Sequence, residues 1–145
     1  MANDTVIKFG YPQSLIREYN DWVVLLRPQQ ATLASLVLAS KEDAREFKNV
    51  ASNSMTEMHS IVGDIESTLS NLFSYKKINY LMLMMVDPHV HFHVIPRYSS
   101  PQMCLGNEFI DPGWPALPKL DYRTELTDDM FNDLKALISK HWPSS

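Results

Sequence analysis

Three histidines alternate with apolar residues in the segment His89-Val90-His91-Phe92-His93-Val94-Ile95-Pro96-Arg97. In an extended strand, alternate side chains share one face, and residues two apart lie about 6.6 Å from each other. We therefore expect the three imidazoles to form one polar row on a strand, above an apolar underside. Such a row suits the binding of a chain of phosphate groups.

The residues before this segment are apolar at nearly every position from Ile78 to Val86. Such a run is typical of a strand that is covered on both faces, so we expect it to lie in the centre of the sheet. Asp87-Pro88 is a turn signal between this run and the histidines. The two runs therefore predict an antiparallel hairpin that carries the histidine row.

Short apolar segments bounded by turn-like sequence make up much of the first 39 residues. They predict strands over residues 14–19, 22–26 and 35–39. Ser40 is followed by Asp43 at the spacing of a capping box, with Asp in place of Glu, and the residues up to about Asn49 are polar. A short helix is therefore expected directly after the third strand.

Two further helices are predicted by apolar positions at spacings of three and four. The first runs from about Ser54 to about Ser74 and would bury a stripe of five residues: Met58, Ile61, Ile65, Leu69 and Leu72. The second begins at Thr127 and closes the chain. Residues 98–122 between the histidine row and this last helix carry four prolines and two glycines. Because prolines disfavour a helix or a central strand, we expect a long ordered loop there.

The size of the chain favours a single domain. With 145 residues, 45% hydrophobic and 21% charged, it is long enough to bury one hydrophobic core but too short for two domains with a core each. We expect one domain over residues 1–145. Its core with the histidine row would span about 12–98, and the proline-rich loop and C-terminal helix would span 99–145.

Composition also limits the expected cellular location and the expected binding partners. No segment approaches the roughly 20 apolar residues of a membrane span, and the N-terminus lacks a signal-peptide pattern, so we expect a cytoplasmic protein without membrane contact. Cys104 is the only cysteine, which excludes an internal disulfide and a multi-cysteine metal site. A net charge of −4 argues against a nucleic-acid surface, because such surfaces depend on many Lys and Arg contacts.

Three explanations of the histidine row remain open: a structural role, a metal site and phosphate chemistry. A structural role would leave three polar rings on one strand face, which is costly unless each ring is satisfied. A metal site is limited by geometry, since His89 and His93 start about 13 Å apart on a strand and do not converge easily on one ion. The rest of the sequence offers no motif that supplies the missing ligands.

Phosphate chemistry uses the properties of histidine directly. Histidine titrates near neutral pH, so one neutral ring can attack while neighbouring rings donate hydrogen bonds to phosphoryl oxygens. His91 has a neighbour on each side and is the natural nucleophile. His89 and His93 are placed for adjacent phosphate oxygens and for the leaving group.

The segment from His89 to Arg97 resembles the signature of the histidine triad (HIT) superfamily, in which three histidines alternate with apolar residues. The trailing Pro96-Arg97 is similar to its fragile-histidine-triad and dinucleoside polyphosphate hydrolase branches. The resemblance covers roughly residues 12–98, where the order of strands, helix and hairpin agrees. It implies an α+β fold with an antiparallel five-stranded sheet, a long helix and a C-terminal helix, usually assembled as a homodimer.

The resemblance also implies a reaction. In this superfamily the middle histidine attacks the α-phosphorus of a nucleoside phosphate and forms a covalent nucleotidyl-histidine, which water or another acceptor resolves. Carried onto this chain, the nucleophile is His91, and His89 and His93 orient it, bind phosphate and assist the leaving group. Because position 93 is His and not Gln, hydrolysis is favoured over nucleotidyl transfer. The expected substrate is a nucleoside polyphosphate, a dinucleoside polyphosphate or a nucleoside phosphoramidate.

Two departures from the superfamily pattern support an alternative, a nucleotide-binding module with little or no turnover. A further histidine of the superfamily is replaced by Ser35, which can donate a hydrogen bond but carries no charge. The superfamily's Asn, Gly and Gly-Gln loop is also missing, because residues 84–88 run directly into His89.

Arg27 and Arg97 are candidates for the remaining positive charge, since a guanidinium matches the oxygens of a phosphate. The candidate phosphate ligands are therefore His89, His93, Ser35 and Arg97. These residues require no cofactor, although a divalent ion could accompany a polyphosphate substrate. The expected partners are a small nucleotide and a second copy of the chain.

Overall fold

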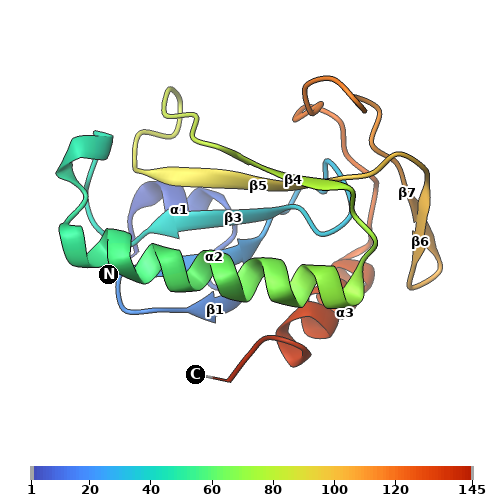
Figure 1. The fold of residues 1–145 in the computed structure, drawn as a ribbon, viewed down its shortest axis with the longest axis horizontal. Coiled ribbons are helices and arrows are strands. Elements are labelled where there is room, and N and C mark those ends of the chain that lie inside the picture. The colour runs from blue at the N-terminus through green and yellow to red at the C-terminus, as the bar shows by residue number, and fades with distance from the viewer. Residues whose placement is uncertain (1, 145) are drawn as a thin grey trace.

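An antiparallel five-stranded sheet is the centre of the fold in residues 2–144, the part of the chain that the computed structural model describes (Figure 1). Its strands are β1 (Leu15–Glu18), β2 (Trp22–Leu26), β3 (Leu36–Ser40), β4 (Lys77–Leu81) and β5 (His91–Arg97), in the spatial order β1-β2-β3-β5-β4. The sheet confirms the predicted fold class. The predictions over 14–19, 22–26 and 35–39 agree with β1, β2 and β3 to within one residue.

Helices cover both faces of the sheet. The long helix α2 (Ser52–Leu72) crosses one face, and the short helix α1 (Asp4–Lys8) lies behind the sheet in Figure 1. The C-terminal helix α3 (Asp128–Lys140) contacts β1 and α2. The helices α2 and α3 confirm the two predicted long helices. No helix within residues 2–144 is long and apolar enough to cross a membrane.

The cap residues define where two of these helices begin. The side chain of Thr127 accepts a hydrogen bond from the Met130 N–H at the start of α3, as expected for an N-cap. The side chain of Asn3 accepts from the Val6 N–H at the start of α1. Sequence reasoning missed α1 because a helix of five residues is too short to show an apolar period.

Side chains of the sheet alternate between two buried faces. The larger core lies beneath α2 and contains Trp22 and Val24 of β2 together with Leu36 and Leu38 of β3. A smaller buried cluster on the opposite face consists of five residues: Val6, Val23, Leu25, Val37 and Ala39. Because Val6 belongs to α1, this short helix closes the second face of the sheet.

The register of β5 places the histidine row on the smaller face. Ala39 pairs with His91 and Val37 pairs with His93. Directly opposed residues of neighbouring strands point to the same side of a sheet. His91 and His93 therefore lie on the face covered by α1, away from α2, whereas His89 precedes the strand.

The prediction of a central strand over Ile78–Val86 is wrong. The strand β4 ends at Leu81 and lies at the edge of the sheet, because β5 pairs with both β3 and β4. Met85 and Val86 follow it in the connection to β5, with 91% and 83% of their surfaces exposed. The antiparallel pairing of β4 with β5 is confirmed. An apolar run alone does not distinguish a buried central strand from an edge strand followed by an exposed apolar connection.

The short helix expected between Ser40 and Asn49 is also wrong, since only a 3-10 turn, η1 (Phe47–Asn49), forms there. Ser40 is the last residue of β3, and its hydroxyl accepts a hydrogen bond from the Glu42 N–H. The carboxylate of Asp43, which would complete a capping box, instead forms a hydrogen bond with His89. The polar segment is therefore a loop that is attached to the triad.

The long loop expected over residues 98–122 contains a small hairpin of β6 (Gln102–Cys104) and β7 (Asn107–Phe109). Its two-residue turn has positive φ angles at Leu105 (51°) and Gly106 (81°), the pattern of a type I′ turn. Prolines do keep a helix or a central strand out of this segment. The hairpin was missed because leucine rarely adopts a positive φ angle.

Candidate active site

His91 is 0% exposed and has one ring nitrogen without a partner. Its Nδ1 lies 2.6 Å from the backbone oxygen of His89. A carbonyl oxygen only accepts, so Nδ1 carries the proton and Nε2 carries the lone pair. Nε2 is buried and has no hydrogen-bond partner within residues 2–144. This lone pair is available for attack on an electrophile.

Phe9, the residue after α1, packs beside the rings of His91 and His93. The centroid of its ring lies 5.6 Å from that of His91 and 5.5 Å from that of His93, edge-on to the latter. The rings of His91 and His93 are themselves 5.2 Å apart. Phe9 is therefore part of the surface that buries the two imidazoles. No feature of the sequence indicated this contact.

His93 is held as a neutral ring by Arg27. Its Nδ1 accepts a hydrogen bond of 3.2 Å from Nε of Arg27, which leaves Nε2–H as a donor. Burial lowers the pKa of His93 to about 4, and the nearby Arg27 and His91 add to this. At neutral pH the ring therefore contributes a hydrogen-bond donor and no charge.

Arg27 lies at the end of β2 and brings a buried cation to the triad. Its Nη1 donates to the Gln29 oxygen at 2.7 Å, and its Nη2 donates to the Leu120 oxygen at 3.3 Å. Burial lowers the pKa of the guanidinium, but an arginine stays protonated in a protein. Of the two arginines that the sequence offered, the structure brings this one to the histidines.

His89 has both ring nitrogens engaged. Its Nε2 lies 2.8 Å from Oδ1 of Asp43, and its Nδ1 lies 2.9 Å from Oγ1 of Thr5. The hydrogen bond with His89 holds the pKa of the exposed Asp43 carboxyl below its usual range, and Arg45 adds to this. The ring thus ties the loop before β5 to α1 and fixes the carbonyl that accepts from His91.

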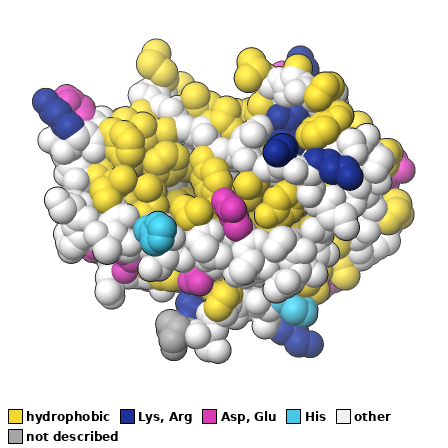
Figure 2. Space-filling model, viewed as in Figure 1, with side chains coloured by type: hydrophobic (Ala, Val, Ile, Leu, Met, Phe, Trp, Pro, Cys, Tyr) yellow, Lys and Arg dark blue, Asp and Glu magenta, His cyan; other side chains and the backbone are white. Residues whose placement is uncertain are grey.

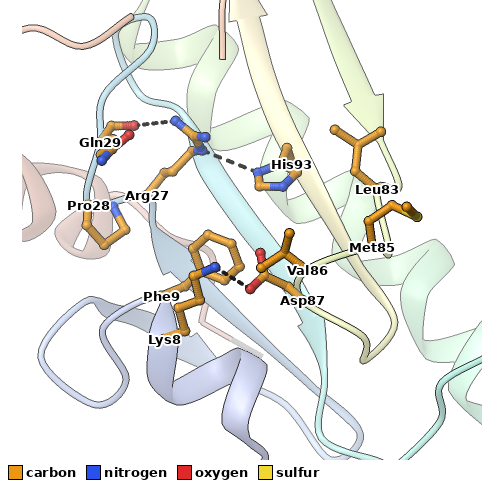
Figure 3. A pocket seen from close by; sticks show the side chains of 10 residues that line it. All are labelled: Lys8, Phe9, Arg27, Pro28, Gln29, Leu83, Met85, Val86, Asp87 and His93. Atoms are coloured by element: carbon orange, nitrogen blue, oxygen red, sulfur yellow. Dashed lines mark hydrogen bonds and ion pairs between the residues drawn. The ribbon is translucent and has the colours of Figure 1, made fainter. Parts of the chain in front are cut away.

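A cleft of about 460 Å³ opens beside His93 (Figure 3). Arg27 and Gln29 line one side of it, and Leu83 and Met85 line the other. Its volume lies within the range of roughly 300–1,000 Å³ that is common for small-molecule sites. No group of three His, Cys, Asp or Glu side chains in the described part of the chain is arranged to hold a metal ion.

Comparison with known proteins identifies the family. The HIT domain matches residues 11–100, which is more than half of the chain. This chain belongs to the HIT family. A search of curated proteins found no match.

Solved structures of HIT proteins share the fold. A histidine triad protein from Sinorhizobium meliloti is 16% identical, with a TM-score of 0.75 over 97% of this chain and 96% of that chain. A histidine triad protein from Marinobacter aquaeolei is 19% identical, with a TM-score of 0.71 over 88% and 87%. A diadenosine triphosphate hydrolase from Plasmodium falciparum is 10% identical, with a TM-score of 0.63 over 89% and 76%.

In this HIT domain, two of the expected phosphate ligands are engaged elsewhere. The hydroxyl of Ser35 donates to the Thr32 oxygen at 2.8 Å inside the turn before β3 and is 0% exposed. Arg97 donates to both carboxylate oxygens of Asp111, at 2.7 and 3.1 Å, and to Oδ1 of Asn79 at 2.9 Å. The structure does not bring Ser35 or Arg97 to His91, and both have structural partners.

Proposed function

We propose that this HIT protein hydrolyses a nucleoside phosphate at its α-phosphorus, through a nucleotidyl group carried on Nε2 of His91. The observation that carries the proposal is the unpartnered lone pair on this nitrogen. Its ring lies 5.2 Å from that of His93, which accepts a hydrogen bond from the buried cation of Arg27. A nucleophile, a cation and a donor are the groups that phosphoryl transfer needs. A protein of similar fold is a diadenosine triphosphate hydrolase.

The reaction has two steps. The lone pair of His91 Nε2 forms a bond to the α-phosphorus while the bond to the leaving group breaks, and the leaving group keeps that electron pair and takes a proton from water. The carbonyl of His89 stabilises the cationic ring through Nδ1–H. Water then attacks the phosphorus, the electron pair of the P–N bond returns to Nε2, and a nucleoside monophosphate is released with loss of one proton to solvent.

Arg27 and His93 supply the electrostatic part of the reaction. The guanidinium balances the charge of the phosphate, and Nε2–H of His93 donates to a phosphoryl oxygen or to the departing atom. Both groups are fixed by hydrogen bonds before the ligand arrives. These two groups of the site are therefore preorganised.

Turnover with a matched pair of variants tests this proposal. A panel of nucleoside polyphosphates and phosphoramidates should yield a nucleoside monophosphate with the wild-type protein and none with His91→Ala. His59→Ala is the control, because His59 is exposed on α2 and away from the triad face. Saturable nucleotide binding without product would support the alternative, a nucleotide-binding module, and contradict hydrolysis.

We also propose that the protein acts in the cytoplasm as a homodimer, as its resemblance to HIT proteins implies. The edge strand β4 has one ladder side without a strand partner in residues 2–144, and such an edge can pair with another chain. Light scattering should give twice the chain mass of 16.7 kDa. A particle of the mass of one chain at micromolar concentration would contradict the dimer.

A further inference from the structure

Lys8 and Asp87 form an ion pair in the lining of the cleft that opens beside His93. Nζ of Lys8 donates to Oδ1 of Asp87 at 2.5 Å, and both residues line the cleft (Figure 3). Lys8 is the last residue of α1 and precedes Phe9, whose ring packs beside those of His91 and His93. The ion pair therefore brings an ammonium group into the cleft next to the triad.

The ammonium of Lys8 is held but remains open to the cleft. The side chains of Lys8 and Asp87 are 52% and 17% exposed. An ion pair that is open to water contributes little to stability, and a lysine ammonium sits on a flexible stem with rotatable donors. Lys8 can therefore exchange the carboxylate of Asp87 for an atom of a bound substrate at little cost.

Cleavage at the α-phosphorus creates a need for a proton. The departing atom receives the electron pair of the bond that breaks, and an amine or an alcohol leaves poorly as an anion. A positioned side chain that gives this atom a proton accelerates such a step about 100- to 10,000-fold. Lysine is one of the side chains that serve as general acids in enzymes.

The other polar side chains that line the cleft from the same side hold their protons. Arg27 stays protonated in a protein, and the amide of Gln29 does not ionise. Burial lowers the pKa of His93 to about 4, so its ring is neutral at neutral pH. Because Nδ1 of this ring accepts from Arg27, loss of Nε2–H would leave an anion. Among the described residues that line the cleft, Lys8 is the group that can release a proton and recover it.

The connection between β4 and β5 lines the cleft with Leu83, Met85 and Val86. Hydrophobic side chains cover the tip of this connection where it projects from the body of the protein (Figures 1 and 2). Such side chains carry no proton that can be transferred. The side of the cleft that α1 supplies therefore carries the proton donor.

We propose that Lys8 is a further catalytic residue, whose ammonium, in place of a water molecule, protonates the departing atom of the substrate. Asp87 is its positioning residue and holds the ammonium in the cleft before the substrate binds. The inference rests on the proposed hydrolysis at His91 and names the proton donor of that reaction.

The proton returns to Lys8 in the second step. First, Nε2 of His91 bonds to phosphorus, and the departing atom takes the electron pair of its bond and a proton from Nζ, which leaves Lys8 as a neutral amine. Water then attacks phosphorus and gives one proton to this amine, and the electron pair of the P–N bond returns to Nε2. Each turnover thus consumes one water and restores the ammonium.

Two adenosine 5′-phosphate substrates that differ in their need for a proton test the inference. The N-propyl phosphoramidate releases an amine, whose nitrogen must gain a proton as its bond to phosphorus breaks. The 4-nitrophenyl ester releases 4-nitrophenolate, which leaves as an anion. We compare the ratio of kcat/KM for the phosphoramidate to that for the ester, because kcat/KM reports the step in which the leaving group departs.

Lys8→Arg is the sharpest variant, because arginine keeps a cation in the cleft but holds its protons. It should lower the ratio about a hundredfold or more, with little change in kcat/KM for the ester. Lys8→Gln should lower the ratio to the same extent. Lys48→Gln is the control, because Lys48 also pairs with a carboxylate, that of Glu46 at 3.4 Å, but does not line the cleft.

Asp87→Asn tests the positioning role. It leaves the ammonium in place without its carboxylate and should lower the same ratio several-fold, less than either Lys8 variant. A ratio equal to that of the wild type would contradict the role of Asp87.

The outcomes separate the inference from the proposed function. An equal loss on both substrates in the Lys8 variants, with a normal thermal transition, would show that Lys8 acts through its charge or the fold, and would overturn the inference. An unchanged kcat/KM for the phosphoramidate in Lys8→Arg would overturn it too. Wild-type turnover of the ester alone would overturn the inference while hydrolysis at His91 stands. Turnover of neither substrate would overturn both.

Discussion

The two ends of β5 differ in whether their buried polar side chains have hydrogen-bond partners. At its C-terminal end, the side chains of Arg97 and Asp111 are 5% and 0% exposed, and the guanidinium meets the carboxylate twice and Asn79 once. At its N-terminal end, His91 is equally buried but its Nε2 has no partner in residues 2–144. We call the C-terminal end, where these buried side chains have partners, the satisfied end, and the N-terminal end, with the free Nε2, the unsatisfied end. The first stabilises the fold, and the second carries the candidate nucleophile.

The largest expected effect separates activity from stability at the unsatisfied end. His91→Gln should lower kcat by about a thousandfold or more, because the attacking nitrogen is lost. Its Tm should fall little, since the glutamine amide can donate to the His89 oxygen in place of Nδ1–H, and the other lost nitrogen, Nε2, has no partner in the described part of the chain. Steady-state kinetics and thermal unfolding check the two halves. A large loss of Tm would show that His91 is a structural residue.

The satisfied end should respond in the opposite manner. Asp111→Ala leaves the buried guanidinium of Arg97 without its carboxylate and should lower the free energy of unfolding by about 3–5 kcal/mol. Urea unfolding measures this change. Asp121→Ala is a matched control, because Asp121 is exposed on the same long segment. If Asp111→Ala reduced kcat with no loss of stability, the division between the two ends would be contradicted.

Asp43 acts on the nucleophile His91 through His89, so its substitution tests whether the contacts around the unsatisfied end serve activity or stability. Asp43→Asn should lower kcat several-fold, since a weaker partner for His89 loosens the carbonyl that orients His91. Its KM should change little. Glu46→Gln, an exposed acidic residue of the same loop, is the control. An Asp43→Asn enzyme with the kcat of the wild type would assign the Asp43–His89 pair to stability alone.

Phe9 packs against the ring that carries the unsatisfied nitrogen. Phe9→Ala should increase the rate at which diethyl pyrocarbonate modifies His91 several-fold, because an aromatic ring that helps to bury His91 is removed. Mass spectrometry of the His91 peptide measures the rate. Phe47→Ala is the control, since Phe47 contacts Phe92 and neither of the two histidines in β5. Equal rates in both variants and the wild type would mean that Phe9 does not help to bury His91.

The last expected effect is the pH dependence of stability that comes from His93. Burial lowers the pKa of His93 from its usual value near 6.5 to about 4, so the unfolded chain takes up the proton first as the pH falls. Its contribution to stability is complete above pH 6.5 and is lost as the pH drops towards 4. His93→Gln should flatten urea stability across this window, and an unchanged slope would contradict the assignment.

Local patterns in the sequence predicted the long helices and the first three strands. The apolar stripe of α2 has the period of a helix with one buried face. The strands β2 and β3 are buried at every position, so they appear in the sequence as short apolar runs between turns. The triad identified the strand with the candidate nucleophile. The sequence did not predict that β4 lies at the edge of the sheet. The apolar residues over 78–86 belong to two different structures, a strand that pairs with β5 and a connection that lines a cleft.

The contacts that complete the site join residues far apart in the chain. Thr5 lies in a five-residue helix and Phe9 directly follows it, and both contact histidines more than 80 residues later. Arg27 and Arg97 both lie at strand ends, and only the fold decides that Asp111 engages the second while the first reaches His93. Asp43 fitted a helix cap in the sequence, since nothing local reveals its partner His89.

The most direct test is the position of the nucleotide on the protein during turnover. The reaction should be quenched with acid-free denaturant within milliseconds, and the peptides should be analysed by mass spectrometry at neutral pH, where a P–N bond survives. The account predicts a nucleoside monophosphate on the peptide that carries His91, attached at Nε2. Attachment at His89 or His93, or product that accumulates with no labelled peptide at any time, would contradict it.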